Sequence, residues 1–178
     1  DPPGRRRVAR ADVDEATGRL AALLREERAD VLLGYDANGG YGHRDHVKVH
    51  EVGRRAGELA GVGAVLEATM PREAAERLIR LVRVLRIPFR YDVDALREAF
   101  SARADITHRV TVRRFARQKQ AALAAHRSQV SGNGRLAPVM RALVRMPPWL
   151  FGLVAGHEWY VDPARTPTPR PLTDVFGS

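Results

Sequence analysis

Chemically active side chains are concentrated in one stretch of the sequence, residues 35–46, which reads YDANGGYGHRDH. It holds two histidines, two aspartates and two tyrosines around a glycine-rich turn. An apolar run, residues 30–34, precedes it, and a helix-like run, residues 46–61, follows it. The stretch is therefore predicted to be a loop at the carboxyl end of a strand, which is where active sites lie in open α/β sheets.

The centre of this loop is formed by His43, Asp45 and His46. Imidazole is a good ligand for Zn²⁺, and a catalytic zinc usually has three protein ligands and a water. If a helix begins near Asp45, both histidines can reach one small volume, and Asp45 can orient the ring of His43. His50 adds the i, i+4 spacing to His46 that zinc-binding helices use, although the HExxH order is absent. On these residues alone, a metal site and a solvated turn capped by Asp45 both remain open.

The elements around the loop follow from hydrophobic spacing. Residues 12–29 are predicted to be a helix, with Asp12 as its N-cap and Glu15 in the capping-box position. Residues 31–33 form a short buried strand, and the helix after the loop ends at Gly61 or Gly63. Residues 64–69 read as a second strand. Helices alternating with short apolar strands predict an α/β fold with a mostly parallel sheet flanked by helices.

Further elements are predicted in the rest of the chain, which reads as a single domain over residues 1–178 with a proline-rich tail over 163–178. They are a helix over 72–86 that Pro88 ends, a helix over 92–100, a strand over 106–112, a helix over 113–130, and a strand over 157–161.

Composition excludes several classes of protein. The absence of cysteine excludes disulfides, thiolate metal sites and a cysteine nucleophile, and it favours a cytoplasmic location. The longest apolar region, residues 136–156, is interrupted by Arg141, Arg145 and a Pro-Pro pair, so it does not predict a membrane span. The first residue is Asp1, without the layout of a signal peptide, and we expect that upstream sequence is missing.

The net charge of +9 raises nucleic acid as a partner. However, only two of the 30 basic residues are lysines, Lys48 and Lys119, and this skew is typical of a GC-rich coding sequence. We therefore expect no nucleic-acid partner. The arginines between Arg72 and Arg103 could form an anion-binding patch or a solvated helix face.

Two motifs resemble one known family. Residues 35–46 match the pattern YDxNGGYGHxDH, which resembles the second signature of the LmbE-like (PIG-L) zinc-dependent N-deacetylases, nearest to the mycothiol-pathway deacetylases and amidases of actinobacteria. Residues 119–129, KQAALAAHRSQ, are similar to the family's KxxALxxHxSQ helix. The two matches occur in the family's order and at a family-like separation.

The resemblance implies a Rossmann-like α/β fold and hydrolysis of an N-acyl group, typically the acetyl group of an amino sugar such as N-acetylglucosamine. By position, it implies that His46 is a Zn²⁺ ligand and that His43 stabilises the oxyanion. It further implies that Asp45 orients His43 and that Tyr41 lies over the substrate carbonyl. His126, within the second motif, is expected to be structural.

One departure from the family is large. The family's first signature, AHPDDE, supplies two further zinc ligands and the general base, and this sequence lacks it. We therefore expect an N-terminally truncated domain that binds zinc weakly and is inactive by itself. The alternative is a non-catalytic carbohydrate-binding or interaction domain derived from the same fold. The sequence does not identify the N-acyl substrate.

Overall fold

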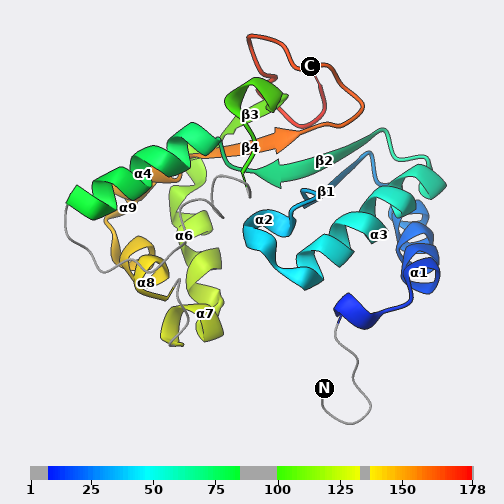
Figure 1. The fold of residues 1–178 in the computed structure, drawn as a ribbon, viewed down its shortest axis with the longest axis horizontal. Helices are drawn as coiled ribbons and strands as arrows, with labels where there is room; N and C mark the ends of the chain where they lie inside the picture. Colours follow the sequence, from blue (N-terminus) through cyan, green and yellow to red (C-terminus); the bar gives the residue numbers. More distant parts are fainter. Residues whose placement is uncertain (1–7, 85–99, 133–136, 178) are drawn as a thin grey trace.

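The structure of the protein is a computed structural model that describes residues 8–84, 100–132 and 137–177 (Figure 1). Helices and strands are interspersed in the first part of the chain, and a run of helices lies between β3 and β4. In chain order the elements are η1 (Val8–Arg10), α1 (Val13–Glu26), β1 (Val31–Tyr35), α2 (Gly39–Gly42), α3 (Arg44–Ala60), β2 (Ala64–Thr69), α4 (Arg72–Val84), η2 (Arg103–Asp105), β3 (His108–Thr111), η3 (Arg113–Phe115), α6 (Ala116–Ala125), α7 (Arg127–Ser131), α8 (Ala137–Arg145), α9 (Pro148–Val154) and β4 (His157–Val161).

The four described strands form one mixed sheet in the order β1-β2-β4-β3. β1 pairs with β2 in parallel, whereas β4 is antiparallel to both of its neighbours. The α/β class is confirmed, but the prediction of a mostly parallel sheet is wrong for the described strands. The reason is that β4 enters between β2 and β3 in the reverse direction, a non-local pairing that the alternation of elements does not reveal.

The first half of the chain packs as a helical layer on β1 and β2. Asp12 caps α1, since its Oδ1 accepts the Glu15 backbone N–H at 2.8 Å, and Gly61 ends α3 in the left-handed region at φ 72°. Both ends are as predicted. α1 packs on α3 around the fully buried Ala21 and Ala56, and α3 in turn packs on the two strands (Figure 1).

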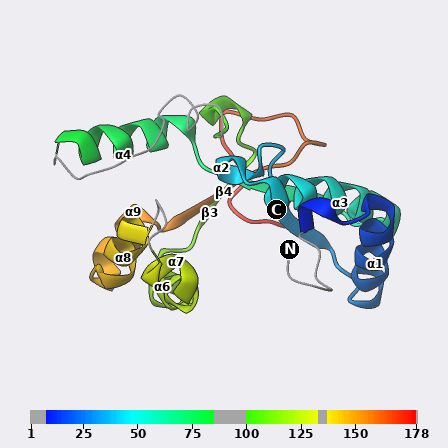
Figure 2. The same ribbon diagram turned by 60° about the horizontal axis from the view of Figure 1, so that its bottom comes forward.

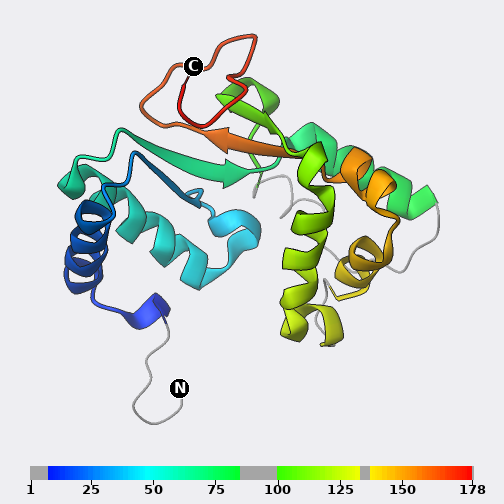
Figure 3. The same cartoon turned by 180° about the vertical axis from the view of Figure 1, so that it is seen from behind.

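The second half forms a separate helical group, α6 to α9, beyond the other end of the sheet (Figures 2 and 3). The Gln120 side chain ties α6 to the end of α8 by donating to the carbonyls of Leu143 and Met146 at 2.8 and 2.7 Å. The single helix predicted over residues 113–130 is wrong. It breaks at His126, whose ψ of 63° is not helical and whose ring bonds back to the Ala122 carbonyl at 2.9 Å.

Several other predictions can be compared with the structure. The strands predicted over 64–69 and 157–161 are confirmed, and β3 lies within the strand predicted over 106–112. β1 is less buried than predicted, since Leu33 is 50% exposed. The helix predicted over 92–100 and the Pro88 stop lie outside the described residues. In the tail, Leu172 makes two backbone hydrogen bonds to β3 and its flank. Within the described residues, no helix is both long and apolar enough to span a membrane.

The closest approach between α3 and the sheet is at Gly57, where an added Cβ would lie 2.5 Å from Val65 Cγ2. We therefore expect Gly57→Ala to lower the free energy of unfolding by about 1 to 3 kcal/mol. Gly53→Ala is the matched control, because its Cβ would meet Leu32 Cδ2 at an ordinary 3.8 Å. That change should raise stability by up to about 1 kcal/mol through helix propensity.

Denaturant unfolding of the two variants measures both effects. A Val65→Ala background should remove much of the Gly57→Ala penalty, because it deletes the clashing methyl group. Equal stability of the two single variants would contradict the close packing described here.

Candidate active site

The two histidines of the motif come together at the beginning of α3. His43 is the N-cap of that helix, and its Nδ1 accepts the backbone N–H of Asp45 at 3.2 Å. His46 lies in the first turn, and the two ring centroids are 4.7 Å apart. The sequence-based expectation that both side chains reach one small volume therefore agrees with the geometry.

The ring of His46 is held on two sides. It stacks on the ring of Tyr35, with 3.9 Å between the centroids and 5° between the planes. Its Nδ1 lies 3.2 Å from the carbonyl oxygen of Gly39, so the ring donates there in the tautomer that carries the proton on Nδ1. A histidine that ligates a metal through Nε2 is commonly oriented by such a bond from its other nitrogen to a carbonyl.

The turn that supplies this carbonyl is α2. Its three glycines, Gly39, Gly40 and Gly42, have φ values of 64°, 69° and 83°. The buried Asp36 organises the turn, because its backbone carbonyl accepts the Gly39 N–H and its Oδ1 accepts the Gly40 N–H, each at 2.9 Å. The glycines thus let the chain fold back from β1 onto α3.

Two other residues of the predicted site are placed differently. The carboxylate of Asp45 accepts the backbone N–H of Ala9 at 2.9 Å and so ties the segment before α1 to the first turn of α3. Tyr41 lies in the α2 turn, but its side chain is outside the described part of the structure. The roles expected for both residues stay predictions.

A charged contact behind the histidines was not predicted from the sequence. His50, one turn after His46, lies with Nδ1 3.0 Å from the Tyr35 carbonyl and 3.3 Å from Glu67 Oε1 on β2. The contact with Glu67 lacks the alignment of a hydrogen bond. The sequence indicated this contact only through Glu67, a charged residue inside the short apolar strand over 64–69. Its partner could not be predicted, because it depends on how α3 lies on the sheet.

Glu67 is only 8% exposed, and burial raises the pKa of its carboxyl group above the ordinary range. The charges of His50 and Arg54 act in the opposite direction, while Asp36 and Asp162 add to the rise. Acidic groups therefore lie buried close to the histidine turn.

The remaining histidines lie on other elements. His108 is buried on β3, with its Nδ1 2.8 Å from the Thr107 hydroxyl. His126 is exposed, and His157 contacts Arg109. Within residues 8–84, 100–132 and 137–177, no three histidine, cysteine, aspartate or glutamate side chains come close enough to hold a metal. His46 fits a single ligand position there, not a complete zinc site.

Comparison with known proteins identifies the family, although no family model matches the chain. Curated relatives at 33–41% identity are deacetylases, and the chain belongs with them to the LmbE-like (PIG-L) family, as the two motifs indicate.

In particular, a 1D-myo-inositol 2-acetamido-2-deoxy-alpha-D-glucopyranoside deacetylase of Saccharomonospora viridis is 34% identical over 174 residues, which cover 97% of this chain and 62% of the relative. Deacetylases of the same name from Thermobispora bispora and Thermomonospora curvata are 33% and 41% identical over 90% and 68% of this chain, or 55% and 45% of their own lengths. The chain thus spans about half the length of these relatives or a little more.

The α2 turn depends on Gly39, where a Cβ would lie 2.8 Å from the backbone nitrogen of Val47. Gly42 has a similarly positive φ, but a Cβ there would meet nothing within 4 Å. Gly42→Ala therefore introduces backbone strain alone, and Gly39→Ala adds a clash. We expect Gly39→Ala to destabilise the protein by about 1 to 3 kcal/mol more than Gly42→Ala. Denaturant unfolding measures the difference, and equal losses would exclude the clash.

Glu67 gives a prediction for the pH dependence of stability. The pKa of Glu67 is higher in the folded than in the unfolded protein. The stability that Glu67 contributes is therefore fully present below its unfolded pKa and is lost as the pH rises through its folded pKa. Glu67→Gln does not titrate, so its unfolding free energy relative to wild type should increase from pH 4 to pH 7.

Glu51→Gln is the opposite-sign control for this experiment. The hydrogen bond from Lys48 lowers the pKa of the exposed Glu51, so Glu51 stabilises the fold above its unfolded pKa. The relative stability of Glu51→Gln should therefore fall slightly with pH. If the stability of Glu67→Gln relative to wild type also falls as the pH rises, the contact with His50 affects the pKa of Glu67 more than burial does.

Proposed function

We propose that the complete protein containing this chain is a zinc-dependent N-deacetylase, a C–N hydrolase that removes an acetyl group from an amino-sugar conjugate. The observation that carries the proposal is the approach of His43 and His46, 4.7 Å apart at the carboxyl end of β1, in a chain 34% identical to a deacetylase of an N-acetylated glucopyranoside. Carboxyl ends of strands are the usual place for α/β active sites.

In this proposal His46 is one zinc ligand and binds through Nε2. The contact of its Nδ1 with the Gly39 carbonyl and the stack on Tyr35 support that orientation. The other ligands and the general base would come from outside the described residues. When bound, zinc lowers the pKa of water and polarises the acyl oxygen.

His43 is proposed to stabilise the oxyanion that forms when the acyl carbon is attacked. Its Nδ1 accepts a backbone N–H, so the neutral ring carries its proton on Nε2, which can donate to that oxygen. One such donor is worth about 3 kcal/mol in the transition state. The leaving amine gains the proton that the attacking water loses, transferred by the general base.

The remaining parts of the proposal follow the family resemblance. Asp45 would orient His43, and Tyr41 would lie over the substrate carbonyl. The backbone N–H of Asp45 donates to His43 Nδ1, whereas its carboxylate accepts the Ala9 N–H. We further propose a Rossmann-like sheet for the complete domain and a cytoplasmic location.

The proposal is tested by substitution of each histidine in the full-length protein. We expect His46→Ala to lower bound zinc per protein and to abolish turnover of an N-acetylglucosamine glycoside. His43→Ala should keep the zinc but reduce kcat at least about a hundredfold. Metal analysis and amine release measure these effects. The 178-residue chain alone should bind zinc weakly and show no turnover.

His126→Ala is the control, because this exposed histidine lies at the α6–α7 break. It should leave both zinc content and kcat unchanged. Unchanged zinc in His46→Ala would refute the ligand assignment, and turnover by the 178-residue chain alone would refute the need for further ligands.

A further inference from the structure

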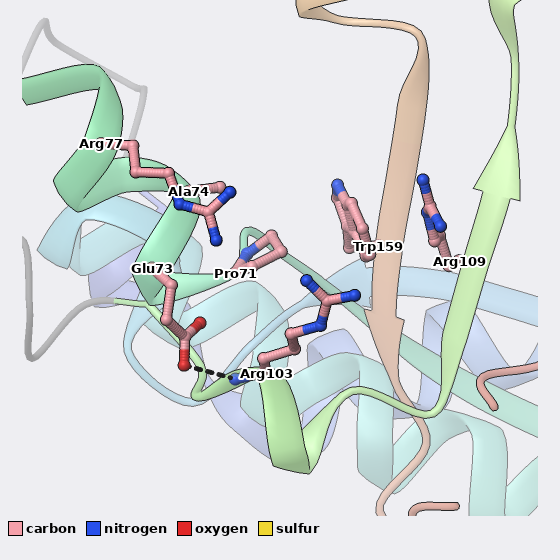
Figure 4. A pocket seen from close by; sticks show the side chains of 7 residues that line it. All are labelled: Pro71, Glu73, Ala74, Arg77, Arg103, Arg109 and Trp159. Atoms are coloured by element: carbon pink, nitrogen blue, oxygen red, sulfur yellow. Dashed lines mark hydrogen bonds between the residues drawn. The ribbon is translucent and has the colours of Figure 1, made fainter. Parts of the chain in front are cut away.

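A pocket lies beyond the histidine turn at the same end of the sheet (Figure 4). Its volume is about 190 Å³, and its walls come from the beginning of α4, from η2 and from strands β3 and β4. The residues that line it are Pro71, Glu73, Ala74, Arg77, Arg103, Arg109 and Trp159. Arg77 and Arg103 lie on one side of Trp159 in Figure 4, and Arg109 lies over the other side of its ring.

The three guanidinium groups of this pocket have few acidic neighbours in the part of the chain that the structure describes. Among the described residues, none of the three makes an ion pair with a carboxylate. Arg109 instead lies 5.1 Å from the centroid of the Trp159 ring and 3.0 Å from Nε2 of His157. Burial lowers the pKa of His157, and the positive charges of Arg109, Arg113 and Lys119 lower it further, which favours the neutral ring that accepts from Arg109.

Glu73 is the single acidic residue in the wall of the pocket. Its Oε1 accepts the backbone N–H of Arg103 at 3.3 Å, as the dashed line in Figure 4 shows. Its Oε2 is buried without a hydrogen-bond partner among the described residues. The pocket therefore keeps a net positive charge and also offers one acceptor for a hydroxyl group.

The pocket opens at the same edge and on the same face of the sheet as the candidate active site. Val65, Glu67 and Thr69 of β2 point to one face by alternation, and α3 contacts the first two. Trp159 pairs with Thr69 and Arg109 pairs with Trp159, so both share that face.

The distance between the two sites is short. Tyr35, on which His46 stacks, pairs with Ala68, the residue before Thr69. Two strand spacings separate β1 from β4, which places the Cα atoms of Tyr35 and Trp159 roughly 10 Å apart. One small molecule can therefore reach both sites.

We propose that this pocket binds the phosphate group of a phosphorylated sugar. Guanidinium groups match phosphate oxygens in a forked geometry, so Arg77 and Arg103 suit a phosphate dianion, and Arg109 adds positive charge nearby. Trp159 offers an apolar surface for the sugar ring, and Glu73 Oε2 accepts from a ring hydroxyl. Phosphate binding in this pocket is independent of the proposed function. The further step, in which the same molecule presents its N-acetyl group to His43, rests on the proposed function.

Calorimetric titration of the 178-residue chain tests the pocket without any deacetylase reaction. The ligands are N-acetylglucosamine 6-phosphate and unphosphorylated N-acetylglucosamine, in the presence of a chelator. We expect the phosphorylated sugar to bind at least about tenfold more tightly. Arg77→Ala and Arg103→Ala should each weaken its binding about tenfold, and Arg103→Lys, which keeps the charge without the fork, should weaken it less.

Arg145→Ala is the matched control, since it removes the same charge from an exposed position at the end of α8. Circular dichroism verifies that each variant is folded. Equal affinity for the two sugars would overturn the proposal. A loss of affinity in Arg145→Ala as large as that in Arg103→Ala would also overturn it, because it would indicate only general attraction by the basic chain. Phosphate binding together with unchanged zinc in His46→Ala would support the pocket and refute the proposed function. If the chain shows no preference for the phosphorylated sugar while His46→Ala loses zinc, the pocket proposal is refuted and the proposed function stands.

Discussion

The close contact between α3 and the parallel strands β1 and β2 determines where the histidine turn lies. Gly53 and Gly57 leave the face of α3 toward the sheet without bulk, so its backbone approaches Leu32 and Val65 closely. Protein interiors pack densely, and a helix that approaches the sheet this closely has little freedom to shift. That position brings His50 within 3.0 Å of the Tyr35 carbonyl and brings the first turn of α3, with His46, against the Tyr35 ring.

Features of the fold that depend on neighbouring residues were predictable from the sequence. Asp12 caps a helix through a side chain three residues from its partner, and Gly61 ends one through its own φ. The direction of β4 was not predictable, because its pairing partner β3 lies before four intervening helices in the chain. The break at His126 was also missed, since the sequence around it has a continuous helical pattern and a local ring-to-carbonyl bond interrupts it.

The same distinction applies to the candidate site. His43 and His46 converge because they flank one helix start, a relation that spacing alone predicts. Glu67 meets His50 only because α3 lies on β2 in one register, and no local pattern encodes that register. The arginine pocket takes Arg77 from α4 and Arg103 and Arg109 from the later elements η2 and β3, so composition indicated basic residues without indicating where they lie.

The distribution of charge along the sheet edge relates the two sites. Deacetylation converts a neutral amide into an amine that takes up a proton, so positive charge develops at the substrate nitrogen. Asp36 and Glu67 are buried beside the histidine turn, whereas three guanidinium groups lie on the far side of β2. Under the two proposals above, a phosphorylated amino sugar would bind with its nitrogen toward His43 and its phosphate toward Trp159. The reverse orientation would place phosphate beside buried acids and ammonium beside arginines, and like charges in a partly desolvated site repel strongly.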